Sequence, residues 1–361
     1  MQALLALEDG KVFRGQSFGA SGERYGEVVF NTSMTGYQEI LTDPSYRGQI
    51  IAMTYPLIGN YGINPEDVES FKPFAEGLVV KECCKRPSSW RSQKTLAAYL
   101  KENNLLGIEG VDTRSLTLHI REAGAMKAVL STSDLDPKRL VQKAKNSRGL
   151  VGVDLVREVT KNEIYAWMRP KGKRHKVVVL DCGVKYNILR ELLKNRCQAV
   201  VVPAHTGADA ILKLKPDGLL LSNGPGDPTA ISYVIETTRK LIGRLPIFGI
   251  CLGHQVLGLA LGGKTYKLKF GHHGANHPVK DLKTGKVYIT VQNHGFCVDI
   301  DSLDHKEIEI THLNLNDQTL EGMRHKKLPI FSVQFHPEAS SGPRDAGYLF
   351  AEFIKVMEKY A

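Results

Sequence analysis

The chain has 361 residues, 42% hydrophobic and 24% charged, which is the composition of an ordinary folded protein and not of a disordered or fibrous one. Its formal net charge is +10, yet residues 1–150 hold 19 basic against 17 acidic side chains, so most of the excess lies in residues 151–361. No aromatic-studded basic groove accompanies this charge, which argues against a nucleic-acid partner, and the length favours two domains.

The cysteine content and the hydropathy argue against a disulfide-rich, a zinc-stabilised or a membrane-spanning protein. The six cysteines include no Cys-x-x-Cys pair, so we expect neither a disulfide framework nor a structural metal site. The most apolar window, residues 245–263, contains several glycines and polar side chains and predicts a buried strand followed by a helix, not a membrane span. Residues 1–11 show no pattern of a secretory signal, so we expect a cytoplasmic protein without a membrane partner.

Residues 1–150 predict an α+β domain. Short apolar runs separated by glycines predict strands, and the segment 31–46, rich in hydroxyl groups and turn formers, predicts an ordered loop that presents polar groups. No catalytic set is apparent in this half, which favours a binding or docking role. The expected strands are 4–7, 12–13, 27–30, 49–53 and 77–80, and the expected helices are 94–104, one opened by Asp112, and 137–147.

Residues 151–176 lose their periodicity and predict a linker, and the pattern then changes to alternating strands and helices over 177–361. Fully apolar strands separated by helices predict a mostly parallel sheet with helices on both faces, whose functional groups gather at the carboxyl ends of the strands. The alternating runs within 264–333 predict an antiparallel extension of this sheet. The expected strands are 177–180, 199–202, 218–221 and 246–250, and the expected helices are 184–195, 229–243 and 255–261.

Cys251 follows the fourth of these strands, between Gly249 and Gly253. Gly-x-Cys-x-Gly between a strand and a helix is the thiol form of a nucleophile elbow, a tight turn that leaves no room for side chains at the two glycines. The first N–H groups of the helix favour a thiolate and can hold an oxyanion. A buried structural cysteine is the alternative interpretation.

A cysteine nucleophile needs a base and a group that orients this base. His336 ends another apolar run, and Glu338 lies two residues later, so in extended chain both side chains point the same way. These residues and Cys251 therefore predict a Cys-His-Glu triad, although His-Pro-Glu could also be an ordinary turn. The glycines of the loop 223–228 allow close backbone approach to a ligand, and the polar run 292–296 suits a pocket wall.

Two further patterns are weaker indications of a functional site, one for phosphate and one for a metal. Residues 258–265 spell a phosphate-binding P-loop, but they follow a predicted helix and precede a strand, whereas a P-loop needs strand, loop and helix in that order. His272, His273 and His277 could bind a metal, but no matching acidic or cysteine partner is spaced near them. We expect a structured loop there and no metal.

The motifs 249–255, 223–228 and 336–338 together resemble the class I, triad-type glutamine amidotransferases. The segments 33–46 and 271–278 and the N-terminal domain resemble the small-chain family of carbamoyl phosphate synthetase, a ligase that uses glutamine as amide donor. This resemblance implies that Cys251 attacks the glutamine side chain through a thioester, that His336 protonates the leaving ammonia, and that Glu338 orients His336. It implies that the residues contacting glutamine are Ser45, Gly224, Gly226, Leu252, Gln255, Asn293, Gly295 and Phe296, with Gly224 and Leu252 forming the oxyanion hole.

The resemblance also implies a large partner chain that consumes ATP, Mg²⁺ and bicarbonate, with no cofactor on this chain, and a product that feeds arginine and pyrimidine synthesis. The alternatives are the glutaminase subunit of another synthase, a stand-alone γ-glutamyl hydrolase or thiol peptidase, and a non-catalytic scaffold. The N-terminal domain argues against the first, and the intact triad argues against the last. Copurification with a larger chain would separate a subunit from a stand-alone hydrolase.

Overall fold

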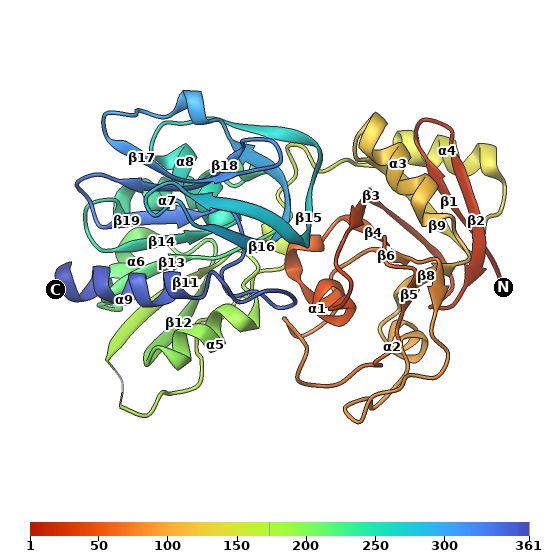
Figure 1. Ribbon diagram of the computed structural model, residues 1–361, viewed down its shortest axis with the longest axis horizontal. Coiled ribbons are helices and arrows are strands. Elements are labelled where there is room, and N and C mark those ends of the chain that lie inside the picture. The colour runs from red at the N-terminus through yellow and green to blue at the C-terminus, as the bar shows by residue number, and fades with distance from the viewer. Residues whose placement is uncertain (173, 361) are drawn as a thin grey trace. The chain divides into compact units, whose positions relative to one another are not determined.

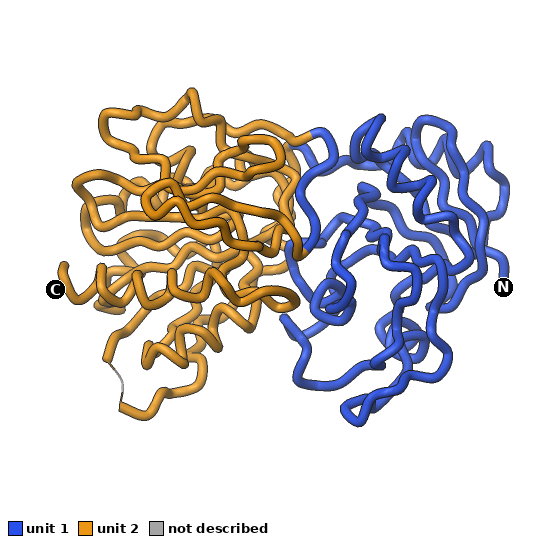
Figure 2. The backbone as a smooth tube through the Cα atoms, in the orientation of Figure 1, with its two compact units in different colours: residues 1–151, 269–274 blue, residues 152–268, 275–361 orange. Residues whose placement is uncertain are grey.

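The computed structural model of the chain describes residues 1–172 and 174–360, so Lys173 of the predicted linker lies outside the described residues. The chain forms two units (Figure 2). The first contains Met1–Val151 together with Lys269–Gly274, and the second contains Gly152–Leu268 and Ala275–Ala361.

A closed barrel with the strand order β1-β2-β8-β6-β4-β3-β9 forms the first unit (Figure 1). Alternation along β1 explains its two sides: Leu5 and Leu7 belong to one buried cluster, whereas Leu4 packs in another cluster with Leu140 of α4. The strands are β1 (Gln2–Leu7), β2 (Val12–Ser17), β3 (Glu23–Asn31), β4 (Gln49–Met53), β6 (Gly77–Val79), β8 (Leu106–Glu109) and β9 (Met126–Ser131), with β5 (Leu57–Ile58) and β7 (Glu82–Cys83) paired separately. The helices are α2 (Leu96–Glu102), α3 (Thr113–Ala123) and α4 (Pro137–Asn146).

The prediction of a loop over 31–46 is wrong for its second half. Residues Tyr37–Thr42 form helix α1, and Pro44–Tyr46 form the 3₁₀ helix η1. Tyr37, Ile40 and Leu41 have helical spacing, and all three are buried, so the large apolar side chains that interrupt the polar pattern form a helix face.

The second unit is built on a ten-stranded sheet of order β10-β12-β11-β13-β14-β19-β18-β17-β15-β16. The strands β12, β11, β13, β14 and β19 run parallel, as the sequence predicts, and β19-β18-β17-β15 are antiparallel neighbours. The predicted antiparallel extension is therefore confirmed. The strands are β10 (Tyr165–Ala166), β11 (His175–Asp181), β12 (Cys197–Pro203), β13 (Gly218–Leu221), β14 (Ile247–Ile250), β15 (Thr265–Asp281), β16 (Val287–Val298), β17 (Ile308–Asn314), β18 (Leu320–His325) and β19 (Ile330–Val333).

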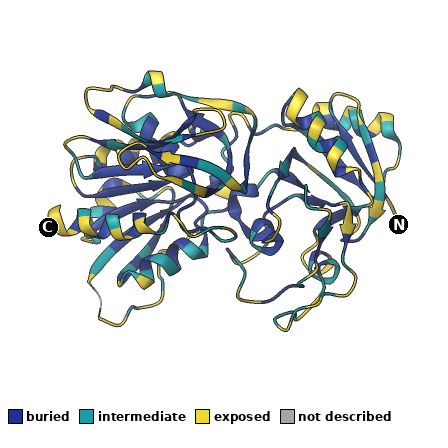
Figure 3. Cartoon of the chain, in the orientation of Figure 1, coloured by how far each residue is buried: buried dark blue, intermediate teal, exposed yellow. Residues whose placement is uncertain are grey.

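Helices cover both faces of the parallel strands, because successive apolar residues point to opposite sides. Val178 and Leu180 pack in a cluster with α6, α7 and α8, whereas Val177 and Val179 pack with α5 and α9. The parallel strands β11, β13, β14 and β19 are accordingly mostly buried (Figure 3). The helices are α5 (Tyr186–Lys194), α6 (Ala208–Lys213), α7 (Ser232–Leu241), α8 (Leu252–Ala260) and α9 (Tyr348–Tyr360), with 3₁₀ turns η2 (Val156–Glu158), η3 (Pro228–Ala230) and η4 (Ile300–Ser302).

The segment 152–172, within the predicted linker, packs on the second unit. Val156 is buried in the core of that unit, and β10 pairs antiparallel with β12. The Asp181 carboxylate accepts a hydrogen bond from the Lys161 N–H at 3.0 Å, which ties this segment to the end of β11. Among the described residues, no helix is both long and apolar enough to cross a membrane.

Candidate active site

The elbow at Cys251 has the strained backbone that its sequence predicts. Cys251 lies between β14 and α8 with φ 54° and ψ −105°, a conformation that side-chain-bearing residues rarely adopt. A Cβ at Gly249 would lie 2.7 Å from the Gly253 carbonyl oxygen, and one at Gly253 would lie 2.2 Å from the Leu221 carbonyl oxygen. The expectation that only glycine fits on either side of Cys251 is confirmed.

His336 and Glu338 form the predicted pair. His336 follows β19, the neighbour of β14, and its Nδ1 lies 2.7 Å from Glu338 Oε1 with both residues buried. Burial lowers the pKa of His336, but the Glu338 charge and Cys251 raise it, and the balance brings this pKa to about 10. Because Nδ1 faces the carboxylate, Nε2 is the ring nitrogen that can act on the thiol, and the imidazole is protonated at neutral pH.

Lys185 is a site residue that the sequence analysis missed. It is only 2% exposed, and its Nζ lies 3.0 Å from Glu338 Oε1 and 2.8 Å from the Ala339 carbonyl oxygen. Burial raises the pKa of Glu338, but Lys185 and His336 outweigh burial and lower this pKa to about 2. The signal was its position: Lys185 is the N-cap of α5, in the short turn that follows the carboxyl end of β11 at Asp181, yet a lysine before a predicted amphipathic helix looks solvent-exposed.

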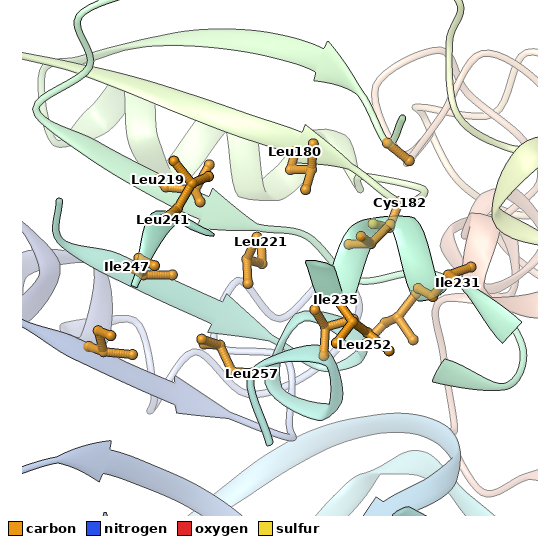
Figure 4. Close-up of a cluster of buried hydrophobic side chains, with 14 of the residues drawn as sticks. Leu180, Cys182, Leu219, Leu221, Ile231, Ile235, Leu241, Ile247, Leu252 and Leu257 are labelled. Atoms are coloured by element: carbon orange, nitrogen blue, oxygen red, sulfur yellow. The ribbon is translucent and has the colours of Figure 1, made fainter. Parts of the chain in front are cut away.

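The loop after β13 brings backbone close to the start of α8. A Cβ at Gly224 would lie 2.2 Å from the Cys182 carbonyl oxygen and 2.7 Å from Leu252 Cδ2. Cys182 and Leu252 belong to the same buried cluster (Figure 4). Leu252 is the first residue of α8, where intrahelical bonds leave the N–H free. Gly226 has φ 83° and lies against Leu155, where a Cβ would be 3.4 Å from Leu155 Cδ1.

The predicted pocket wall lies beside the thiol. Cys251 Sγ is 3.6 Å from the Asn293 carbonyl oxygen and 3.7 Å from Nε2 of Gln334, a residue that the sequence analysis did not single out as a site residue. Gln255 Nε2 donates to the Phe296 carbonyl oxygen at 2.8 Å and to Gln334 Oε1 at 3.1 Å. The segment 293–296 is therefore held next to Cys251 through these amide groups.

Other sequence predictions have different outcomes. The P-loop spelling over 258–265 covers the end of α8 and the start of β15, which is the wrong context for a phosphate loop, as predicted. The expectation of a structured loop at His272, His273 and His277 is wrong, because all three lie in strand β15. Ser45 lies in η1 of the first unit, where the Asp43 carboxylate accepts from its N–H at 2.9 Å.

Comparison with known proteins identifies two family models. Residues 5–130 match the carbamoyl-phosphate synthase small chain, CPSase domain, and residues 178–356 match glutamine amidotransferase class-I. A match to a solved structure from Thermoplasma acidophilum, described as that of a GMP synthase subunit, covers 51% of this chain and 94% of that chain, at 24% identity and a TM-score of 0.45.

Curated relatives extend over nearly the whole chain. A carbamoyl phosphate synthase small chain from Syntrophotalea carbinolica is 58% identical over 99% of this chain and 98% of its own length. Proteins of the same name from Aquifex aeolicus and Chlorobaculum tepidum are each 56% identical, over 99% of this chain and 99% and 98% of their own. The chain therefore belongs to the carbamoyl phosphate synthase small chain family and carries a class I glutamine amidotransferase domain.

Proposed function

We propose that this chain hydrolyses glutamine to glutamate and ammonia with Cys251 as the nucleophile. The observation that carries the proposal is the buried Cys251–His336–Glu338 set on a strained elbow. The thiolate attacks the side-chain amide carbon, and protonated His336 gives its proton to the departing nitrogen, which leaves as ammonia. Water then attacks the γ-glutamyl thioester, releasing glutamate and restoring the thiol.

The oxyanion formed in each step would be held by the N–H groups of Gly224 and Leu252. The close approach of the Gly224 backbone to the start of α8 supports this proposed oxyanion hole. Gly226, Gln255, Asn293, Gly295 and Phe296 are proposed to hold the α-amino and α-carboxyl groups of glutamine. From the family resemblance we also assign Ser45 to the binding of these groups. A Ser45→Ala variant with the wild-type KM for glutamine would refute this assignment.

We further propose that the ammonia passes to a large partner chain in the cytoplasm, which uses ATP, Mg²⁺ and bicarbonate to make carbamoyl phosphate for arginine and pyrimidine synthesis. The curated relatives are named small chains, which supports a larger partner. The triad accounts for amide hydrolysis, and the P-loop spelling at 258–265 lies in the wrong structural context for a nucleotide site. The ATP and Mg²⁺ sites are therefore assigned to the partner.

The test is glutamine hydrolysis by Cys251→Ala. Removal of a triad nucleophile costs about 10⁶-fold in kcat, so activity should be lost, whereas loss of the orienting Glu338 should cost clearly less. Cys197→Ala is the matched control, because Cys197 is equally buried on β12, where burial raises the pKa of its thiol to about 12. A Cys251→Ala variant that hydrolyses glutamine at the wild-type rate would refute the proposal.

A further inference from the structure

A chain of hydrogen-bonded, buried polar side chains connects Glu321 with the segment 293–296 beside Cys251. Glu321 lies on β18 and is fully buried. Its Oε1 accepts a hydrogen bond from Asn314 Nδ2 at 2.8 Å, and its Oε2 accepts one from Gln292 Nε2 at 2.9 Å. A buried carboxylate is costly unless it is satisfied in this way, so its presence calls for a function.

The carboxylate fixes the orientation of the Gln292 amide. Gln292 Nε2 also donates to Thr290 Oγ1 at 3.1 Å, and the Thr290 hydroxyl in turn donates to the His277 carbonyl oxygen at 3.0 Å. Both amide hydrogens of Gln292 are therefore used. Because Gln292 donates to Glu321 Oε2 through Nε2, its Oε1 points the other way, toward the His294 ring.

The His294 ring lies between the Gln292 amide oxygen and the pocket wall, and it contacts both. Its Nε2 lies 3.0 Å from Gln292 Oε1, and its Nδ1 lies 2.8 Å from the Phe296 carbonyl oxygen. Gln255, directly on the elbow helix, donates to the same carbonyl at 2.8 Å. The path thus runs from Glu321 through Gln292 and His294 to the segment 293–296, whose Asn293 carbonyl lies 3.6 Å from the Cys251 thiol.

We propose that Glu321 is a positioning residue for glutamine binding: its carboxylate orients the Gln292 amide, which fixes the His294 ring and with it the wall segment 293–296. This inference rests on the proposed function and deepens it. Glu321 acts only through other residues, so its loss should impair the binding of glutamine more than the chemistry at the triad.

The experiment first replaces Glu321 and then exchanges the side chains of Glu321 and Gln292. In Glu321→Gln one acceptor oxygen becomes an amide that faces another amide, so Gln292 is free to turn and present its NH₂ to His294. One displaced hydrogen bond to a charged group corresponds to roughly a tenfold or greater rise in KM for glutamine, with kcat changed much less. In Glu321→Gln/Gln292→Glu the new amide on β18 can donate to the new carboxylate on β16, which still offers an oxygen to His294, so KM should return toward the wild-type value.

Met323→Ala is the control for simple loss of stability. Met323 lies on the same strand, is buried in the core and contacts that core through packing, so this variant should melt at a lower temperature with an unchanged KM. Should Glu321→Gln not fold, Gln292→Met removes the same link and carries the same expectation. An unchanged KM in the variant measured, or a raised KM that the exchanged pair does not restore, would overturn the inference.

A spectroscopic readout separates this inference from the proposed function. The ¹⁵N signals of the His294 ring report the protonation and hydrogen bonding of each ring nitrogen, and Glu321→Gln should move them whereas Met323→Ala should not. A wild-type chain without glutaminase activity would refute the proposed function, and the ring signals would still test the path to His294. An active wild type whose ring signals are the same in Glu321→Gln would refute the path alone.

Discussion

Single residues at this site carry charges that burial alone would suppress. Burial raises the pKa of Glu338, but Lys185 and His336 outweigh burial and lower it to about 2, while the Glu338 carboxylate raises the pKa of His336 against the effects of burial and of Lys185. A protonated imidazole is the form that can give a proton to departing ammonia. The sequence alone did not indicate Lys185 as a partner, because its side chain pairs with the carboxylate of Glu338, which lies 153 residues later in the chain.

Replacement of Lys185 by methionine should destabilise the protein most near neutral pH and make its stability less dependent on acid. Pairing lowers the pKa of Glu338 to about 2 from an ordinary 4.5, so this group contributes stability that is present above pH 4.5 and lost as the pH falls toward 2. Without Lys185 the folded-state pKa of Glu338 rises toward 4.5, so this group contributes less stability at neutral pH, and the difference between variant and wild type narrows as the pH falls below 4.5. Melting temperatures between about pH 3 and 7 test this shift.

Lys194→Met is the matched control, since the Lys194 side chain is mostly exposed and its ion pair with Glu191 contributes little. Parallel melting curves for wild type and Lys185→Met across the pH range would show that Lys185 does not hold the Glu338 charge.

The packing of strand β14 against helix α8 depends on a close approach of the two backbones at Gly249 and Gly253. At Gly249 a methyl group would press against the Gly253 carbonyl oxygen in α8, and overpacking of this kind costs about 1–3 kcal/mol. Gly249→Ala should therefore lower the free energy of unfolding and displace Cys251 from its strained conformation, with a large loss of activity. Urea denaturation and the rate of Cys251 alkylation by iodoacetamide measure the two effects.

Gly207→Ala provides the comparison. Gly207 caps α6 with φ −72°, and a Cβ there meets no described atom within 4 Å, so the change meets no steric obstacle and carries only the small cost of alanine at an N-cap. Equal stability of the two variants would contradict the steric account of the elbow.

Most elements of the second unit could be predicted because each pattern is local: apolar runs become parallel strands, and the Gly-x-Cys-x-Gly spacing becomes the elbow. The triad could be predicted because its members lie at strand ends that meet at one sheet edge. Lys185, Gln334 and Glu321 could not, since their roles arise from residues brought together by the fold. The barrel in the first unit was also beyond reach, because closure depends on pairing β1 with β9, more than a hundred residues apart.

At the scale of the whole molecule, the proposed division of labour predicts separable half-reactions. With the partner chain, bicarbonate and ATP present, Cys251→Ala should fail with glutamine yet still allow carbamoyl phosphate formation from added ammonium at high pH, where free ammonia is available. Labelled bicarbonate trapped as carbamoyl product, with each nitrogen source in turn, measures this. ATP-dependent synthesis by this chain alone, or loss of the ammonia reaction in a partner-bound variant, would contradict the division.

The short segment Lys269–Gly274 belongs to the first unit, although the strand that contains it continues into the second. Within the first unit the Lys269 carbonyl accepts from the Ala125 N–H at 2.8 Å, the Phe270 ring stacks on Phe30 at 5.7 Å, and the His273 carbonyl accepts from the Thr32 N–H at 3.2 Å. During synthesis on the ribosome, the first unit thus stays unfinished until residue 274 has emerged, well after residue 151. A gene fragment ending at 151 would encode a barrel that lacks these contacts, and a fragment starting at 152 would carry a strand segment whose partners are gone. The two halves of this chain are therefore expected to mature together and not one after the other.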